Sequence, residues 1–244
     1  MVINGLETVV NVDDHLIHDI LLPELNRVAT QRSGQSRGFV FFSAPPGAGK
    51  STIAAILEQH SGSLDLDTIG IDGFHYPNSY LETHHLSADP DILLKDVKGA
   101  PETFDVAALA HHLRESTRRD VKWPIYDRTT HDVVPDGKTI RSSLILVEGN
   151  WLLLDEPGWR DLSDHSAFNI FLEAEPELLR ERLIERKIQG GMDSASATRF
   201  YDTSDRHNVE RVLDGTDRRQ VDLLLRLQPD GTIEPIEIPK EGMK

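Results

Sequence analysis

Apolar residues recur at helical spacing over residues 12–32, near the start of the sequence. They lie mostly three or four residues apart, at Leu16, Ile17, Ile20, Leu21, Leu25 and Val28. This spacing places them along one face of an amphipathic helix. Ser33 and Gly34 follow and favour a helix end. We therefore expect an N-terminal helix over residues 12–32.

Three short segments are continuously apolar instead, at residues 38–43, 143–147 and 167–172. Short apolar runs bounded by turn-forming residues are typical of strands buried on both faces of a parallel sheet. Helical patterns over residues 106–118 and 175–187 alternate with these runs. The alternation predicts an α/β fold of three layers with a mostly parallel central sheet.

Two turn signals predict hairpins. Pro-Asp-Gly at residues 135–137 lies between short β-prone stretches within residues 131–140, which indicates a small surface hairpin. Residues 228–231 separate two further β-prone stretches, 221–227 and 232–238. We expect the second pair to form a hairpin at the edge of the sheet.

Length and charge narrow the classes of protein. A chain of 244 residues suits a single domain, here residues 1–244. Its 26 basic and 41 acidic residues give a net charge of −15. This balance opposes attraction to nucleic acid phosphates and anionic membranes, so any bound phosphate must be captured locally. We expect a small-molecule partner, and a homodimer remains open.

The chain has no cysteine, which excludes disulfides, thiolate metal sites and a cysteine nucleophile. Residues 1–18 lack the basic start and the apolar core of a signal peptide. No apolar run reaches the length that spans a membrane. Together these features predict a cytoplasmic protein.

A glycine-rich loop follows the first apolar run. Residues 44–52 read Ala-Pro-Pro-Gly-Ala-Gly-Lys-Ser-Thr, and a helical pattern continues over residues 53–60. The order of strand, loop and helix matches the phosphate-binding P-loop, with Ala44 in place of the usual first glycine. The predicted ATP-binding residues are Pro46, Gly47, Ala48, Gly49, Lys50, Ser51 and Thr52. Lys50 would contact the β- and γ-phosphates and the Ser51 hydroxyl would bind Mg²⁺. The structural alternative is a tight turn before a helix, without a ligand.

Two carboxylates end predicted strands. Asp72 follows residues 68–71 and precedes Gly73, and Glu148 follows residues 144–147. The carboxyl ends of parallel strands form the ligand-binding edge of open α/β sheets. We expect Asp72 to orient the attacking hydroxyl group and Glu148 to bind Mg²⁺. The alternatives are an Asp-Gly turn and a structural ion pair.

An arginine-rich helix is expected over residues 175–187. Arg182 and Arg186 lie four residues apart and therefore on one face. Arginine matches phosphate oxygens, and two glycines follow at residues 190–191, where a closing segment could rotate. This pattern predicts a lid over residues 180–196 that places both arginines on the transferring phosphoryl group. A solvated, salt-bridged face is the alternative.

These motifs, with those at residues 72–77, 98–105, 124–127 and 147–149, resemble the P-loop kinase superfamily that contains uridine kinase, phosphoribulokinase and type I pantothenate kinase. The resemblance implies a catalytic carboxylate at Asp72, a metal-side carboxylate at Glu148, and a mobile lid carrying Arg182 or Arg186. The full combination, including residues 205–208, looks most like a bacterial branch labelled by inference as fructose transport system kinases or nucleoside/nucleotide kinase-like proteins.

The resemblance also indicates an acceptor pocket built from residues 72–80 and 98–128. The candidate substrate residues are Asp72, His75, Tyr76, Lys98, Tyr126 and Arg128. Asn208 could reach the adenine edge of ATP, or could serve at a helix start or in a loop. Three kinds of phosphate acceptor remain possible: a sugar such as fructose, a nucleoside, or a pantothenate-like alcohol. An ATP-dependent regulatory switch or binding module is the rival class, and a non-catalytic homologue is a third hypothesis.

Overall fold

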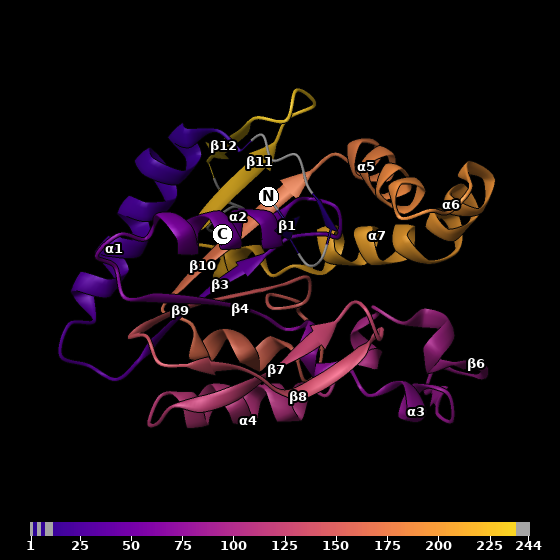
Figure 1. The fold of residues 1–244 in the computed structure, drawn as a ribbon, viewed down its shortest axis with the longest axis horizontal. Helices are drawn as coiled ribbons and strands as arrows, with labels where there is room; N and C mark the ends of the chain where they lie inside the picture. Colours follow the sequence, from indigo (N-terminus) through magenta and orange to yellow (C-terminus); the bar gives the residue numbers. More distant parts are fainter. Residues whose placement is uncertain (1, 4–5, 8–11, 238–244) are drawn as a thin grey trace, which may run out of the picture.

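A six-stranded sheet forms the centre of the molecule (Figure 1). The computed structural model describes residues 2–3, 6–7 and 12–237. Strand order is β12-β11-β10-β3-β9-β4. The bounds are Ile233–Ile236, Leu223–Leu227, Phe168–Ala174, Gly38–Ser43, Leu144–Gly149 and Leu66–Gly70, in that order. All neighbours pair in parallel except β12, which is antiparallel to β11. The predicted mostly parallel sheet is confirmed.

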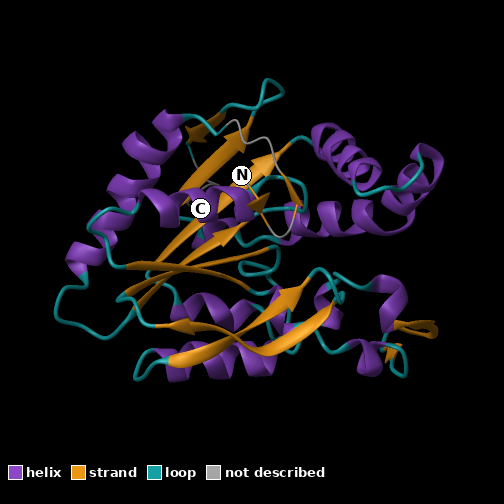
Figure 2. Ribbon diagram, in the orientation of Figure 1, coloured by secondary structure: helices purple, strands orange, loops and turns teal. Residues whose placement is uncertain are grey.

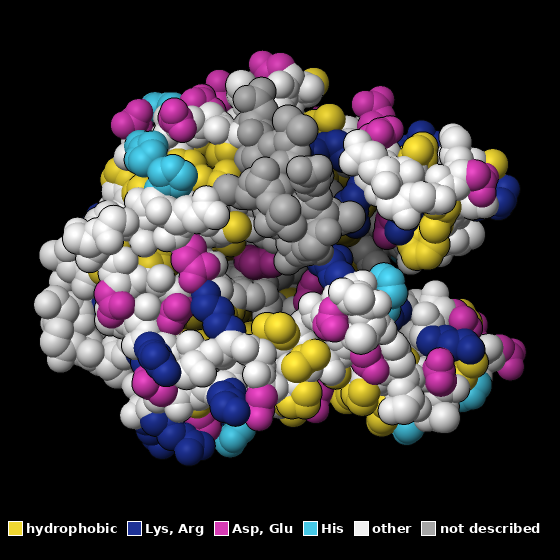
Figure 3. Space-filling model, viewed as in Figure 1, with side chains coloured by type: hydrophobic (Ala, Val, Ile, Leu, Met, Phe, Trp, Pro, Cys, Tyr) yellow, Lys and Arg dark blue, Asp and Glu magenta, His cyan; other side chains and the backbone are white. Residues whose placement is uncertain are grey.

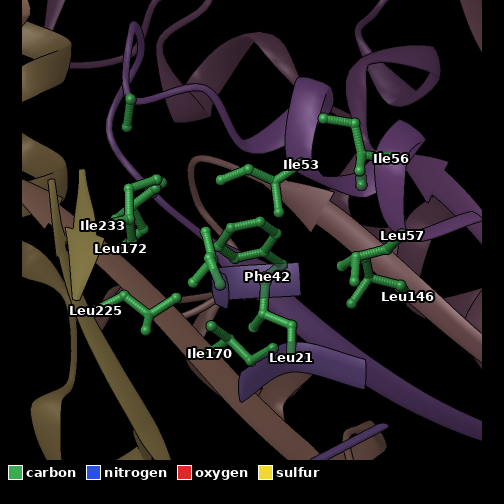
Figure 4. Packing of buried hydrophobic residues seen from close by; sticks show 14 of the residues in the cluster. Leu21, Phe42, Ile53, Ile56, Leu57, Leu146, Ile170, Leu172, Leu225 and Ile233 are labelled. Atoms are coloured by element: carbon green, nitrogen blue, oxygen red, sulfur yellow. The ribbon is translucent and has the colours of Figure 1, made fainter. Parts of the chain in front are cut away.

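Alternating side chains of the central strand point into two separate hydrophobic cores. Phe42 packs with the helices on one face, and Figure 4 shows it beside Ile53 and Leu21. Phe41 belongs to the core on the opposite face, together with Trp123. The first core includes residues of η1 (Leu16–Leu21), α1 (Leu22–Gln31), α2 (Lys50–His60) and α5 (Pro176–Gln189). The second core contains α4 (Val106–Ser116) and η5 (Arg160–His165). Helices thus flank the sheet in three layers (Figure 2).

Most of the expected elements are observed near their expected bounds. The predicted helix over residues 12–32 is present and begins with a π-helical stretch, η1, before α1. The three apolar runs are the strands β3, β9 and β10, and the two later helical patterns are α4 and α5. The predicted edge hairpin is the pair β11 and β12, although Ile238 lies outside the described residues.

The hairpin expected with its turn at residues 135–137 is wrong. These residues lie inside one strand, β8 (Asp132–Ile140), which pairs with β7 (Val121–Asp127), and the connecting turn lies at residues 128–131. Trp123 pairs with Lys138 and Ile125 pairs with Val134, so Pro135, Asp136 and Gly137 together face a single residue. They form a bulge opposite a proline, which has no N–H to donate to the ladder.

The remaining elements form two groups beside the sheet. Above the carboxyl end of the sheet lie α5, α6 (Ser194–Phe200), η6 (Tyr201–Asp205) and α7 (Arg206–Gly215). Below it lie β7 and β8 with η2 (Asp72–Phe74), α3 (Asn78–Leu81), β5 (His85–Leu86), β6 (Asp89–Leu93), η3 (Leu94–Val97) and η4 (Pro101–Thr103). Figure 3 shows a hollow between the two groups, with acidic and basic side chains at its inner end. The short elements β1 (Val2–Ile3), β2 (Leu6–Glu7) and η7 (Arg218–Gln220) complete the described fold.

None of the described helices is long and apolar enough to cross a membrane.

Candidate active site

The glycine-rich loop has the backbone that its sequence predicts. Gly47 and Gly49 have φ angles of 84° and 102°, in the left-handed region that glycine adopts without strain. A Cβ atom on Gly47 would lie 2.9 Å from Cγ of Leu183 in α5. The loop therefore needs glycine there for both its conformation and its contact with α5. Helix α2 begins directly after Gly49, so its N-terminus faces the loop.

Three adjacent strands bring the loop and two carboxylates to the same edge. The loop follows β3, Glu148 lies near the end of β9, and Asp72 follows β4. Glu148 is flanked in register by Phe42 and Gly70. A Cβ on Gly70 would lie 3.1 Å from Oε1 of Glu148, so the glycine leaves room for this carboxylate. The structure thus brings together the residues that the sequence places at separate strand ends.

Ser51 and Glu148 are directly bonded. The Ser51 hydroxyl donates to Oε1 of Glu148 over 2.7 Å. Burial raises the pKa of Glu148, while Lys50 and the Ser51 hydrogen bond act in the opposite direction. Within the described part of the chain, no group of three or more His, Cys, Asp or Glu side chains could hold a metal ion. Two protein oxygens fit Mg²⁺, which is usually completed by water and substrate phosphates.

Lys50 is partly buried beside these acids. Burial lowers the pKa of its ammonium group, and the charges of Glu148 and Asp72 oppose that shift. Among the described residues, none forms an ion pair with Lys50 within 4.0 Å. A buried cation is costly unless an anion compensates it, so Lys50 fits a site that binds phosphate.

Asp72 lies beside a basic residue from the β7–β8 turn. Nη2 of Arg128 is 3.4 Å from Oδ2 of Asp72, and both side chains keep solvent access. The following residue, Gly73, does make a tight approach, because a Cβ there would lie 2.0 Å from the Pro124 carbonyl oxygen. The Asp-Gly turn is therefore structural at Gly73, while the Asp72 carboxylate remains directed to Arg128.

His75, Tyr126 and Lys98 lie close together. The His75 ring centroid lies 3.7 Å from that of Phe104 and 5.7 Å from that of Tyr126, and its Nδ1 bonds the Asp72 carbonyl oxygen over 2.8 Å. Burial lowers the pKa of His75, which favours the neutral ring. Nζ of Lys98 lies 4.9 Å from the Tyr126 ring centroid. The structure brings these three predicted substrate residues together.

Tyr76 is placed differently. Its ring stacks on Tyr80 with centroids 4.4 Å apart, and its backbone N–H donates to the Thr103 carbonyl oxygen over 2.9 Å. Burial raises the pKa of Tyr76, and Asp105 adds to this shift. In the described structure, no hydrogen bond or ring contact joins Tyr76 to His75 or Lys98. Tyr76 therefore lies against Tyr80 of α3.

The predicted lid helix, α5, packs against the loop. Nη2 of Arg182 lies 3.7 Å from the position of a Cβ on Gly49. Arg186 is close enough to Asp205, Arg128 and Asp72 for their charges to affect its pKa. Both arginines are exposed, yet surrounding protein lowers the pKa of each guanidinium by desolvation. Arg180, on the same helix, lies instead over the Tyr201 ring at 5.6 Å.

Asn208 lies next to the segment expected to bind the acceptor. Its Nδ2 is 3.5 Å from the position of a Cβ on Gly99, whose φ angle is 103°. The N-cap of α7 is Asp205, so Asn208 is not the capping residue of this helix. Its contact with adenine stays a prediction.

Two residues of this region, Asn78 and His131, were not among the candidate substrate residues, although Asn78 lies in the segment 72–80 expected to form the acceptor pocket. Asn78 accepts a hydrogen bond from Lys98 Nζ over 2.6 Å, and the His131 carbonyl oxygen accepts another over 3.0 Å. His131 is the one non-glycine residue with a positive φ angle, 53°, in the described chain. Such a conformation is uncommon and often marks a functional segment. It could not have been read from the sequence, because no turn-forming pattern identifies it.

A second unpredicted feature joins the two sides of the hollow. Arg211 of α7 donates to Oε1 of Glu102 over 2.8 Å and to Oε1 of Glu156 over 2.8 Å. Both carboxylates raise the pKa of Arg211. Trp151 Nε1 also donates to the Gly99 carbonyl oxygen over 3.0 Å. These contacts fix α7 against the segment that carries Lys98.

The strand order, the loop and the carboxylates at the sheet edge define a P-loop protein of the nucleoside triphosphate-binding class. The family model described as "Phosphoribulokinase / Uridine kinase family" matches residues 40–215. The chain therefore belongs to the phosphoribulokinase/uridine kinase family, whose members are ATP-dependent small-molecule kinases.

Individual relatives agree with this membership. "Uncharacterized protein YggC" of Escherichia coli K12 is 40% identical over 237 residues, covering 95% of this chain and 96% of the relative. The "Pantothenate kinase" of Rhodopseudomonas palustris TIE-1 is 35% identical over 152 residues, covering 57% of this chain and 45% of that protein. A crystal structure from Silicibacter sp. TM1040, described as a "putative fructose transport system kinase", has a TM-score of 0.72 and 28% identity, covering 81% of this chain and 96% of that one.

Proposed function

We propose that the protein is an ATP-dependent kinase that phosphorylates a hydroxyl group of a small metabolite. The observation that carries this proposal is the position of Asp72. It lies at the same sheet edge as the P-loop, and its charge affects the pKa values of both Lys50 and Glu148, yet the Ser51 hydroxyl bonds Glu148 and not Asp72. A carboxylate in that position is available to the acceptor hydroxyl rather than to the metal.

The residues divide into three tasks. The backbone of residues 46–52 and the N-terminus of α2 would hold the phosphates, with Lys50 at the β- and γ-phosphates. Ser51 and Glu148 would hold Mg²⁺. Bound MgATP supplies the γ-phosphoryl group, and ADP is the leaving group. Arg182 and Arg186 would neutralise the phosphoryl oxygens from above.

Asp72 would act on the acceptor. Its carboxylate orients the hydroxyl group and accepts its proton as the new oxygen–phosphorus bond forms and the bond to the bridging oxygen of ADP breaks. No covalent intermediate with the protein is required, because positioning and charge neutralisation account for the catalysis. His75, Lys98, Tyr126 and Arg128 would line the acceptor side.

The names of related proteins suggest which compounds to test as phosphate acceptors. The panel contains fructose, uridine and pantothenate, together with other sugars and small alcohols. The acidic balance of the chain favours a small molecule over nucleic acid as the partner.

ADP release is measured with each acceptor and without one, in wild-type protein and in Lys50→Met. Acceptor-dependent ADP release by the wild type alone supports the kinase. Slow ADP release that no acceptor accelerates would favour the regulatory switch instead. Absence of both ADP release and ATP binding would contradict the proposal.

A further inference from the structure

Lys98 is held on the acceptor side by neutral groups only. Its Nζ donates to Oδ1 of Asn78 over 2.6 Å and to the His131 carbonyl oxygen over 3.0 Å, and it lies 4.9 Å from the Tyr126 ring centroid. No carboxylate of the described residues lies within ion-pair distance of it. An ammonium group has three N–H donors, so one donor and the full positive charge remain.

The carboxylates nearby in the sequence and the fold are engaged elsewhere. Three of them accept hydrogen bonds from backbone amides, at distances of 2.9, 2.7 and 3.1 Å, namely Asp105, Asp127 and Asp132. Glu102 forms an ion pair with Arg211 at 2.8 Å. Among the described residues, then, Lys98 has neutral hydrogen-bond partners and no ion pair, although the chain as a whole has a net charge of −15.

The position of Lys98 is fixed by strained backbone. The φ angle of 53° at His131 turns its carbonyl oxygen toward both Lys98 Nζ and Asn78 Nδ2, which donates to it over 2.9 Å. A non-glycine residue adopts this conformation only when its surroundings hold it there. A lysine fixed in this way has already lost the rotamer freedom that binding a ligand would otherwise cost.

Lys98 and Asp72 flank the same partly buried ring, that of His75. His75 bonds the Asp72 carbonyl oxygen, and the charges of Asp72, Lys98 and Arg128 all act on its imidazole group. Tyr126 lies between Lys98 and His75, 4.9 Å from the ammonium and 5.7 Å from the His75 ring. A molecule seated against His75 and Tyr126 would thus have the carboxylate of Asp72 near one part and the ammonium of Lys98 near another.

We propose that the acceptor is an anion, with its hydroxyl group at Asp72 and a carboxylate or phosphate group bound by Lys98. This inference rests on the proposed kinase function and narrows it to hydroxy acids and phosphorylated sugars. Neutral sugars and nucleosides can accept the remaining N–H of Lys98, but they carry no negative charge to balance its ammonium group.

The test uses pairs of compounds that differ in the anionic group. D-Glycerate is compared with glycerol and pantothenate with pantothenol for carboxylates, and fructose 6-phosphate with fructose for phosphates. Binding is measured by calorimetry in the presence of ADP and Mg²⁺, and kcat and KM are measured with ATP. We expect at least one anionic compound to exceed its neutral partner by at least roughly tenfold in affinity and in kcat/KM, as a charged hydrogen bond implies.

Three variants assign the preference to Lys98. Lys98→Gln should remove it by raising KM for the anion roughly tenfold or more with a smaller change in kcat, while Lys98→Arg should retain most of it. Lys95→Gln is the matched control, because Lys95 is exposed on η3, the short helix that ends just before Lys98. If MgATP raises the unfolding temperature of Lys98→Gln by as much as it raises that of the wild type, the variant is folded.

The outcomes separate this inference from the kinase proposal. Equal binding of neutral and anionic partners, a preference that survives in Lys98→Gln, or no binding of any anionic compound would overturn the inference. Binding of an anion that depends on Lys98 without any phosphorylation would support the anion site and contradict the kinase function.

Discussion

The hydroxyl group of Ser51 and Oε1 of Glu148 are joined by a hydrogen bond of 2.7 Å. This bond connects the first turn of α2 with the end of β9 and sets two oxygen atoms side by side at the edge of the sheet. Burial of the carboxylate raises its pKa, so the site holds Glu148 in a state that is unfavourable for the fold. Carboxylates whose pKa is raised by desolvation are common in binding and catalytic sites.

Replacing Glu148 by Gln should therefore stabilise the unliganded protein while it abolishes turnover. Because the pKa is raised on folding, the folded state binds more protons here than the unfolded chain, and stability falls as pH rises through the raised pKa. The variant lacks this loss, so its advantage should grow as pH rises from the ordinary value of 4.5 through the raised pKa of Glu148. Each 1 kcal/mol corresponds to about 2–4 °C in the unfolding midpoint for a chain of this size.

Calorimetric unfolding at several pH values and Mg²⁺-dependent ADP release test this pair of effects. Glu181→Gln, on the exposed surface of α5, should change neither the midpoint nor the rate. A lower midpoint for Glu148→Gln at pH 8 would show that the carboxylate is stabilising, contrary to this reading.

Lys50→Met should lose ATP binding and keep the fold. Methionine preserves most of the unbranched apolar stem and removes the charge that has no direct ion pair among the described residues. Burial lowers the pKa of Lys50, so its charge weakens the fold below that pKa, and stability rises with pH up to the ordinary value of 10.5. We expect no detectable ATP affinity in calorimetry and no loss of thermal stability near neutral pH. Unchanged ATP affinity would remove Lys50 from the site.

Asp72→Asn should affect the chemical step and spare nucleotide binding. The amide keeps the shape of the side chain and can still accept from Arg128, but it cannot take a proton from the acceptor. Turnover should fall by roughly a hundredfold or more with little change in ATP Kd. Asp127→Asn is the control, because that carboxylate binds the Thr129 backbone amide. Similar losses in both variants would indicate damage to the β7–β8 turn rather than a catalytic role.

Gly73→Ala tests the close approach between η2 and β7. A Cβ atom at Gly73 would lie 2.0 Å from the Pro124 carbonyl oxygen, a backbone atom that cannot move aside without shifting β7. We expect a loss of about 3 kcal/mol or more in the free energy of unfolding. Gly190→Ala, where the nearest atoms lie at 3.4 Å, should change it by no more than about 1 kcal/mol. Equal stabilities of the two variants in chemical denaturation would show that β7 can shift to accept the extra methyl group at little cost.

The sequence allowed the nucleotide side of the site to be predicted, because its geometry follows from topology. Once residues 38–43, 68–71 and 144–147 are read as parallel strands, the residues after them must meet at one edge. The glycine loop adds a local backbone signal that needs no tertiary information. Asp72, Glu148 and the P-loop are accordingly found on three neighbouring strands.

The acceptor side depends on contacts that no local pattern encodes. Lys98, Asn78 and His131 come from three segments that meet only when β7 and β8 fold back beside α3. The same pairing explains the wrong hairpin, since residues 135–137 carry turn chemistry but serve as a bulge opposite Pro124. Turn-forming residues suit both structures, and the choice between them is made by the partner strand.

The arginines of α5 give the last prediction. Arg182 and Arg186 lie on one face, with Arg182 beside the P-loop at Gly49 and Arg186 near Asp72, whereas Arg180 lies over Tyr201. Lys187 pairs with Asp205 at 3.3 Å and lies 3.6 Å from the Phe200 ring centroid, so this end of α5 is tied to the following helices. The contacts of Lys187 thus hold α5 in place close to Arg182 and Arg186, the residues that would contact phosphate.

Replacing Arg182 or Arg186 by Ala should lower kcat more than it weakens ATP binding, because these side chains act mainly on charge that develops during transfer. A loss of roughly tenfold to a thousandfold in kcat is expected, with ATP Kd changed by a few-fold at most. Arg180→Ala is the matched control on the same helix and should keep the wild-type kcat. If Arg182→Ala and Arg186→Ala also keep it, the two arginines form an ordinary solvated face, and the position of α5 over the loop serves packing through Leu183 alone.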